Sequence, residues 1–252
     1  TTADFARFNQ KYDIYNRAHW DPRVDPKDFF KSYDMAQAVF KDAEGYRQED
    51  YALRNAAWHL TDWTSELKEH SEDRREGFLD WYTLERPGSP VKREVKDPAE
   101  MSREVKRGAR FLGADLAGVC AVDPRWVYSH HYSRMGKAEK PLEVPEGLTN
   151  AIILAVGMDY EITRTTPSAL GGAGTGWGYS KDVLMVLSLA QFIRNLGYRA
   201  VASLNDTSLS IPMAIQAGLG EYGRLGLLIT QEFGPRVRLG KVFTDLPLSC
   251  DK

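Results

Sequence analysis

The sequence predicts an α+β fold in which helices cover a sheet in layers. Three observations support this prediction. From residue 99 onward, amphipathic helical patterns alternate with short apolar strands, and the links between them are short. One strand, "NAIILAVGM", is almost entirely apolar, which is typical of the middle of a sheet. We expect this layered domain to cover residues 98–252, after a mostly helical unit over residues 1–97.

The elements of the layered domain follow in order along the chain. "AEMSREVKRGARFLGA" predicts an amphipathic helix that ends at Gly113, and "DLAGVCAV" predicts the strand after it. A helix is expected from Tyr179 to Leu196, stopped by Gly197, and its apolar circumference indicates burial under other layers. "SIPMAIQAGLG" predicts a short helix. The remaining strands are expected in "YRAVASL", "GLLITQEFG" and "RVRLGKVFTDLPL".

Residues 1–97 are polar and aromatic, with two segments of helical pattern. These are "DPKDFFKSYDMAQAVFKDAE" and "DYALRNAAWHLTDWTSELKEH", and the linker-like "LERPGSPVKREVKDP" ends the unit near Pro98. Four tryptophans lie in this unit, and two interpretations stay open for them. They are anchors of a small core, or some of them wall an apolar pocket. The four are Trp20, Trp58, Trp63 and Trp81.

Composition excludes several function classes. The 252 residues carry a net charge of -2, which argues against nucleic acid as a partner, because phosphate backbones are held by an excess of Lys and Arg. We expect no transmembrane segment, since no run approaches the roughly 18 apolar residues that a span needs. The two cysteines, Cys120 and Cys250, are too few for a disulfide framework or a four-cysteine metal site. The chain starts at Thr1 without Met, which is compatible with removal of a leader.

The glycine-rich "GGAGTGWGYS" does not match either phosphate-binding loop. Its glycines are not spaced as G-x-G-x-x-G, and Gly-Lys-Ser/Thr is absent. The literal match "GLGEYG" follows a predicted helix and precedes a strand, which is the reverse of a dinucleotide fingerprint. His130 and His131 are adjacent and would face opposite sides of a strand, so a shared metal site is not expected. Gly-x-Ser-x-Gly is also absent, which leaves ordinary hydrolase chemistry without support.

A polar set remains near the centre of the layered domain. Thr175 and Tyr179 are four residues apart and share a face if their helix starts a turn early. "SLNDTSLS", residues 203–210, follows a strand, where ligand sites of layered domains commonly lie. Arg236 and Arg238 would point to one face of the final strand. A turn that closes Asn, Asp, Thr and Ser onto the backbone explains the second cluster equally well.

Several strings together resemble the corrinoid-binding part of the respiratory reductive dehalogenases. They are "LGADLAGVCAVDPRWVYS", "RTTPSALGGAGTGWGYSKDV" and "FIRNLGYRAVASLNDTSLSIPMAIQAGLGEYGRLGLLITQEFGPRVRLGKVFTDLPL". The resemblance covers residues 98–252 and is looser before that, although "ARFNQKYDIYNRAHWDP" is similar to the start of the mature family proteins. It implies a nitroreductase-like, cobalamin-binding domain that removes halide from an organohalide by two-electron reduction and protonation.

The resemblance also implies roles for individual residues. The proton-donating tyrosine of the family falls on Tyr179, the substrate-side asparagine on Asn205, and the arginine that lowers the tyrosine's pKa on Arg238. Arg236 is the second choice for that arginine. A phenol holds its proton at neutral pH and can give it to a carbanion-like centre, and a nearby guanidinium stabilises the tyrosinate left behind.

Further residues are expected to line the substrate and cofactor pocket. The glycine run is expected to leave clearance beside the corrin ring, because a backbone passing close to it has little room for side chains. No protein ligand to cobalt is expected, since the Asp-x-His-x-x-Gly pattern is absent. The expected pocket residues are Thr175, Trp177, Asp206, Thr207 and Ser208, with Gly218, Gly220 and Gly223 beside the nucleotide tail.

One departure from the family is clear. Family members continue past "FTDLPL" into two cysteine runs that ligate 4Fe-4S clusters, and this chain ends at "SCDK" with neither, as expected of a fragment or a shortened relative. The resemblance implies anaerobic organohalide respiration, export through a twin-arginine signal, and a peripheral position on the outer face of the cytoplasmic membrane. It also implies a membrane anchor protein or electron-donor complex as partner, and it is compatible with a homodimer.

Two alternatives stay open. The first is a corrinoid-binding module without catalysis of its own, such as a carrier. The second is the epoxyqueuosine reductase branch, which also uses cobalamin and clusters. The net charge of -2 disfavours the second, because tRNA binding favours a basic face.

Overall fold

The protein is built around a four-stranded antiparallel sheet. The computed structural model describes residues 4–24, 30–66, 77–78, 86–134 and 136–251. The strand order is β1 (Leu116–Ala121), β4 (Asn150–Gly157), β8 (Val237–Thr244) and β5 (Ala200–Ser203), and each neighbouring pair is antiparallel. Helices pack on the sheet in layers, so the predicted α+β class is confirmed.

The sheet has a core on each face. Ile152 and Leu154 of β4 pack on one face with residues of α6 (Ala169–Asn195) and α4 (Pro98–Phe111). Ile153 packs on the other face with Met213 of α7 (Ser210–Gln216). Because alternate side chains of a strand point to opposite faces, a strand covered on both sides is apolar throughout. This explains the continuous apolar run that predicted a central strand.

The long helix α6 begins ten residues before its predicted start at Tyr179. The Oγ of Ser168 accepts a hydrogen bond from Gly171 N at 3.1 Å and caps the helix. The glycine run is therefore helical, and clearance beside a corrin ring stays a prediction. Protein side chains come close to these glycines: Cγ of Arg238 would lie 2.6 Å from a Cβ at Gly178.

Two other predicted elements differ from the structure. The helix expected in "DPKDFFKSYDMAQAVFKDAE" is wrong over residues 32–44, which form turns and irregular chain. The strand expected in "GLLITQEFG" is reduced to β7 (Leu228–Ile229), which pairs with β6 (Glu221–Tyr222) outside the main sheet. The smaller elements are η1 (Gln10–Tyr12), α1 (Ile14–Arg17), η2 (Pro124–Trp126), β2 (His130–Tyr132), β3 (Glu139–Pro141) and α5 (Tyr160–Thr163).

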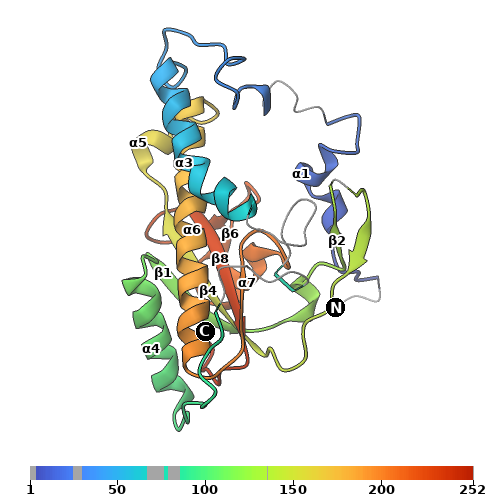
Figure 1. Cartoon of the computed structure of the whole chain (residues 1–252), viewed down its shortest axis with the longest axis vertical. Coiled ribbons are helices and arrows are strands. Elements are labelled where there is room, and N and C mark those ends of the chain that lie inside the picture. The colour runs from blue at the N-terminus through green and yellow to red at the C-terminus, as the bar shows by residue number, and fades with distance from the viewer. Residues whose placement is uncertain (1–3, 25–29, 67–76, 79–85, 135, 252) are drawn as a thin grey trace.

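The first part of the chain packs closely on the layered domain. Helix α3 (Gln48–Glu66) runs along α6 (Figure 1), and Arg7 forms an ion pair with Glu143 at 2.8 Å. Helix α4 begins at Pro98, the residue near which the linker was predicted to end, and Asp97 caps the helix. The division into units 1–97 and 98–252 stays a prediction. Among the described residues, no helix is both long enough and apolar enough to cross a membrane.

Candidate functional site

Four predicted site residues meet where α6 lies against the sheet. Tyr179 and Thr175 project from one face of α6, since they are four residues apart in a helix. Arg238 lies near the start of β8, and Ser203 at the end of β5 pairs with Lys241 of β8. Because β5 and β8 are antiparallel, the residues after β5, beginning with Leu204 and Asn205, pass alongside the first half of β8. All four predicted side chains are half-buried.

The phenolic oxygen of Tyr179 is the centre of this cluster. Asn205 donates a hydrogen bond to it through Nδ2, and Arg238 does so through Nη1 at 3.5 Å. The other guanidinium nitrogen, Nη2, donates to Oγ1 of Thr175 at 3.3 Å, and Cζ of Arg238 lies 4.8 Å from the centroid of the Tyr179 ring. Donors and a positive charge aimed at one oxygen stabilise negative charge there. The arrangement favours release of the phenolic proton.

Trp58 of α3 forms one side of the site. Its ring centroid lies 5.2 Å from that of Tyr179, and its Nε1 donates to Gly172 O at 3.1 Å. The sequence left open which of four tryptophans would border a pocket. Trp20 instead donates to Lys11 O at 2.8 Å, and the side chain of Trp63 is 47% exposed. Trp81 lies outside the described residues.

Trp58 can approach the site because Gly176 has no side chain. A Cβ at Gly176 would lie 2.4 Å from Cδ1 of Trp58. We expect Gly176→Ala to lower the free energy of unfolding by about 1 to 3 kcal/mol, because overpacking displaces the indole. Urea denaturation measures the effect. In the matched control, Gly108→Ala in α4, the new methyl group meets Phe192 at an ordinary 3.7 Å and should stabilise by about 0.5 to 1 kcal/mol.

Two predicted pocket residues lie away from the phenol. Arg236 donates to Met158 O and lies over the ring of Tyr160, with 5.3 Å from Cζ to the centroid. Arg238, and not the second choice Arg236, therefore lies beside Tyr179. Trp177 is 51% exposed and lines a separate hollow of 520 Å³ with α3 and α5 residues, because it points away from Tyr179 on α6.

The other residues of the "NDTS" cluster shape the loop that carries Asn205. Asp206 accepts hydrogen bonds from Ser203 Oγ at 2.6 Å and from Gly77 N at 2.9 Å. Thr207 has φ +70°, and its carbonyl accepts from Tyr128 N at 3.0 Å. Ser208 Oγ lies 3.2 Å from Met213 Sδ. These contacts match the turn interpretation, and a role in the pocket stays a prediction for all three.

The three glycines expected beside a nucleotide tail have local reasons to be glycine. Gly218 adopts φ +72° after α7. A Cβ at Gly220 would lie 2.3 Å from Ile229 O, and one at Gly223 would lie 2.7 Å from Ile229 Cγ1. The β6–β7 hairpin thus explains Gly220 and Gly223, and contact with a cofactor stays a prediction.

Two buried charges beneath the site were missed from the sequence. Lys241 is fully buried; its Nζ donates to Ser210 Oγ at 2.8 Å and to the carbonyl of Leu204, next to Asn205. Asp182 of α6 is fully buried as well, and burial raises the pKa of its carboxyl to about 7 against the attraction of Lys241 and Arg238. The sequence feature that could have indicated these two buried charges is a charged residue inside each of two otherwise apolar segments.

The raised pKa of Asp182 predicts how stability depends on pH. Its folded pKa of about 7 lies above the 3.8 of an unperturbed aspartate, so the stabilising contribution of the protonated carboxyl is complete below about pH 4 and is lost as the pH rises through 7. The difference in unfolding free energy between Asp182→Asn and the wild type should therefore shift in favour of the variant by on the order of 2 to 4 kcal/mol from pH 4 to pH 8, because only the wild type loses this contribution. Urea denaturation at both pH values measures this gain, and a pH-independent difference would contradict it.

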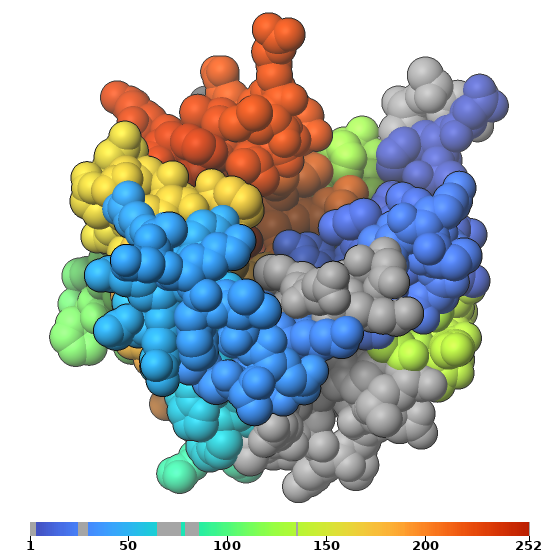
Figure 2. Space-filling view, turned by 90° about the horizontal axis from the view of Figure 1, so that it is seen from above, coloured from blue at the N-terminus to red at the C-terminus, as the bar shows by residue number. Residues whose placement is uncertain are grey.

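The surface is hollowed at the end of the molecule where α6 begins. In the view from above, a recess lies between blue N-terminal residues, the yellow segment that contains α5 and the orange-red residues of the last part of the chain (Figure 2). Among the described residues, no three His, Cys, Asp or Glu side chains come together as a metal site. The described residues offer hydrogen-bond donors beside Tyr179, those of Asn205 and Arg238, that could also face a bound ligand.

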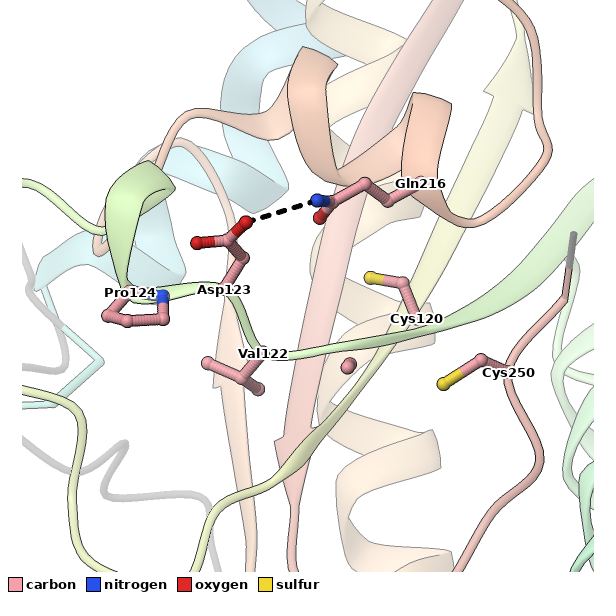
Figure 3. Close-up of a pocket in the computed structure, with 7 residues that line it drawn as sticks. Cys120, Val122, Asp123, Pro124, Gln216 and Cys250 are labelled. Carbon is pink, nitrogen blue, oxygen red and sulfur yellow. Dashed lines mark hydrogen bonds between the residues drawn. The ribbon is translucent and has the colours of Figure 1, made fainter. Parts of the chain in front are cut away.

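Another hollow, of 430 Å³, lies beside β1 (Figure 3). Its side chains include Cys120, Cys250 and Asp123, which accepts a hydrogen bond from Gln216 Nε2 at 3.2 Å. Burial raises the pKa of the Cys120 thiol to about 12, so this thiol stays protonated and is a poor nucleophile. We assign no chemistry to this hollow.

Comparisons with known proteins show which family the chain resembles. A family model described as reductive dehalogenase subunit matches residues 128–248. The tetrachloroethene reductive dehalogenase of Dehalobacter restrictus is 39% identical over 69% of this chain and 37% of its own length. A solved reductive dehalogenase structure associated with B12-dependent dehalogenation aligns over 98% of this chain and 32% of its own, with a TM-score of 0.70 and 19% identity. The epoxyqueuosine reductase of Pseudomonas aeruginosa is 27% identical over 62% of this chain and 50% of its own.

Proposed function

Because residues 128–248 belong to the reductive dehalogenase subunit family, we propose that this chain forms the corrinoid-binding and proton-donating part of a reductive dehalogenase. The observation that carries the proposal is the phenolic oxygen of Tyr179, which faces hydrogen-bond donors of both Asn205 and Arg238. A site that releases a proton from a phenol needs such donors to hold the charge left behind.

The overall reaction assigns a task to these residues. Two electrons and one proton convert a carbon–halogen bond into a carbon–hydrogen bond and a halide ion. Tyr179 supplies the proton to the carbon, and its O–H bond breaks as the new C–H bond forms. Arg238 and Asn205 stabilise the phenolate, and Thr175 holds the guanidinium by accepting from Nη2. Trp58 covers one side of the phenol and limits access of water.

Cobalamin would supply the two electrons when bound. The recess at the end of the molecule where α6 begins is the part of the surface that we propose for this cofactor (Figure 2). Arg238 and Asn205, whose donors face the phenol, would border the cofactor and the small organohalide together. No protein ligand to cobalt is part of this proposal.

The relatives that this chain matches are longer than the chain. The chain spans 37% of the length of the Dehalobacter relative, so the source of electrons is expected in the remaining part. We propose two 4Fe-4S clusters there, a membrane anchor protein or electron-donor complex as partner, and export to the outer face of the cytoplasmic membrane in anaerobic organohalide respiration. Tetrachloroethene, named for the relative, is the first substrate to test.

The test is made on the full-length protein that contains this chain. Its visible absorption spectrum after anaerobic purification reports corrinoid and iron–sulfur content together. Chloride release from tetrachloroethene, with reduced methyl viologen as electron donor, then measures turnover, and we expect chloride and a less chlorinated ethene in equal amounts. Bound corrinoid without chloride release would overturn the proposal in favour of a carrier module. Reduction of epoxyqueuosine-modified tRNA would favour the second alternative.

A further inference from the structure

Asp182 is a buried acid beneath the proton-donating site. It follows Tyr179 by three residues on α6 and has no solvent-accessible surface. Neither of its carboxylate oxygens has a hydrogen-bond partner among the described residues. Buried polar groups are nearly always hydrogen-bonded, so an unpartnered carboxylate calls for a specific explanation.

The carboxylate lies against the strand that carries Arg238. A Cβ at Gly240 would come within 2.3 Å of Asp182 Oδ1, so the glycine makes room for the acid. Residues 238 and 240 are two apart in β8 and share a face of the sheet, which is the face that α6 covers. The Nε of Arg238 is also buried without a partner among the described residues. The carboxylate of Asp182 and the Nε of Arg238, both without a hydrogen-bond partner among the described residues, thus lie along the same face of β8.

We propose that Asp182 is a positioning residue that controls proton release by Tyr179 through the charge of Arg238. This inference rests on the proposed role of Tyr179. When Asp182 is protonated, the charge of Arg238 acts undiminished on the phenol. When Asp182 is ionised, it compensates part of that charge and adds a negative charge near a developing phenolate, so proton release becomes less favourable.

Other charged groups act on Asp182 as well. Lys241 of β8 and Asp206 of the loop after β5 influence it besides Arg238, Lys241 by attraction and Asp206 by repulsion. Lys241 is held by Ser210 Oγ and Leu204 O, and Asp206 by Ser203 Oγ and Gly77 N. Burial raises the pKa of Asp182 to about 7, so its charge changes in the neutral range.

The ionisation of Tyr179 tests the inference without turnover. The full-length protein is labelled with 13C at the phenolic carbon of tyrosine, and its NMR spectrum is recorded against pH. This chain contributes 12 tyrosines, so the Tyr179 signal is assigned as the one that is absent from Tyr179→Phe. We expect Asp182→Asn to lower the pH at which Tyr179 ionises by about one unit. Asp115→Asn is the matched control, because the exposed carboxylate of Asp115 accepts a hydrogen bond from Gly157 N, and its replacement should leave the titration unchanged.

An unchanged Tyr179 titration in folded Asp182→Asn would overturn the inference. If Asp182→Asn does not fold, Asp182→Ser, which also removes the charge, replaces it with the same expectation. The second measurement is the pH profile of chloride release from tetrachloroethene, in which an inflection near pH 7 should be present in the wild type and absent from Asp182→Asn. Full activity of Tyr179→Phe would refute the proposed function while leaving the result of the titration intact.

Discussion

Replacing Tyr179 by phenylalanine is expected to lower the rate of dehalogenation by about 10²- to 10⁴-fold, the usual contribution of a positioned general acid. The substitution removes the hydroxyl that accepts from Asn205 and Arg238 and keeps the ring that contacts Trp58. Chloride release by the full-length protein measures the rate, and the visible spectrum should show that corrinoid remains bound.

Tyr198→Phe is the control for this substitution. Tyr198 also loses a hydroxyl hydrogen bond, to Arg93 O at 2.8 Å, but this bond lies outside the site. We expect its rate to stay within a factor of about two of the wild type, as for an ordinary surface substitution. Equal rates for Tyr179→Phe and the wild type would show that another group donates the proton.

Arg238→Gln is expected to lower the rate by about 10²-fold, which is the order seen when a donor to a developing negative charge is removed. Glutamine keeps hydrogen-bonding capacity toward Thr175 but lacks the charge that lies 4.8 Å from the Tyr179 ring. Because the effect acts through the phenolate, Arg238→Gln should have little further effect in a Tyr179→Phe background. Chloride release by the wild type, both single variants and the double variant measures this coupling.

Additive losses in that cycle would contradict the assignment, since they would mean that Arg238 acts on the substrate independently of the phenol. Arg236→Gln supplies the matched control. Arg236 is two residues away in the sequence and contacts Met158 O and the ring of Tyr160. Its replacement should show no coupling to Tyr179.

The sheet and its main helices could be predicted because their patterns are strong. The strand "NAIILAVGM" is apolar on both faces and matches β4, and "AEMSREVKRGARFLGA" has the period and the glycine stop of α4. The start of α6 was missed because glycine is a poor helix former in isolation. Contacts made by Trp58 and Arg238 stabilise the helix in the fold, and such contacts are invisible to local propensity.

The candidate site could be predicted only in part, because some of its residues are brought together by contacts between distant parts of the chain. Tyr179 and Thr175 follow from helical spacing, and Asn205 and Arg238 from the resemblance to a family. Trp58 is separated from Tyr179 by 121 positions, and nothing in its local sequence distinguishes it from Trp63. Asp182 was missed, because its burial depends on the space left by Gly240 in a distant strand.

The order of strands in the sheet has a consequence for folding. Strand β8 comes last of the described strands yet lies between β4 and β5, so it pairs with β4 residues that lie 80 or more positions earlier. During synthesis β1, β4 and β5 are made before the strand that joins β5 to the others, and loop-closure entropy makes such distant pairing slow. Because Arg238 lies on β8, we expect its contact with Tyr179, and with it the proposed proton-donating arrangement, to be among the last to form.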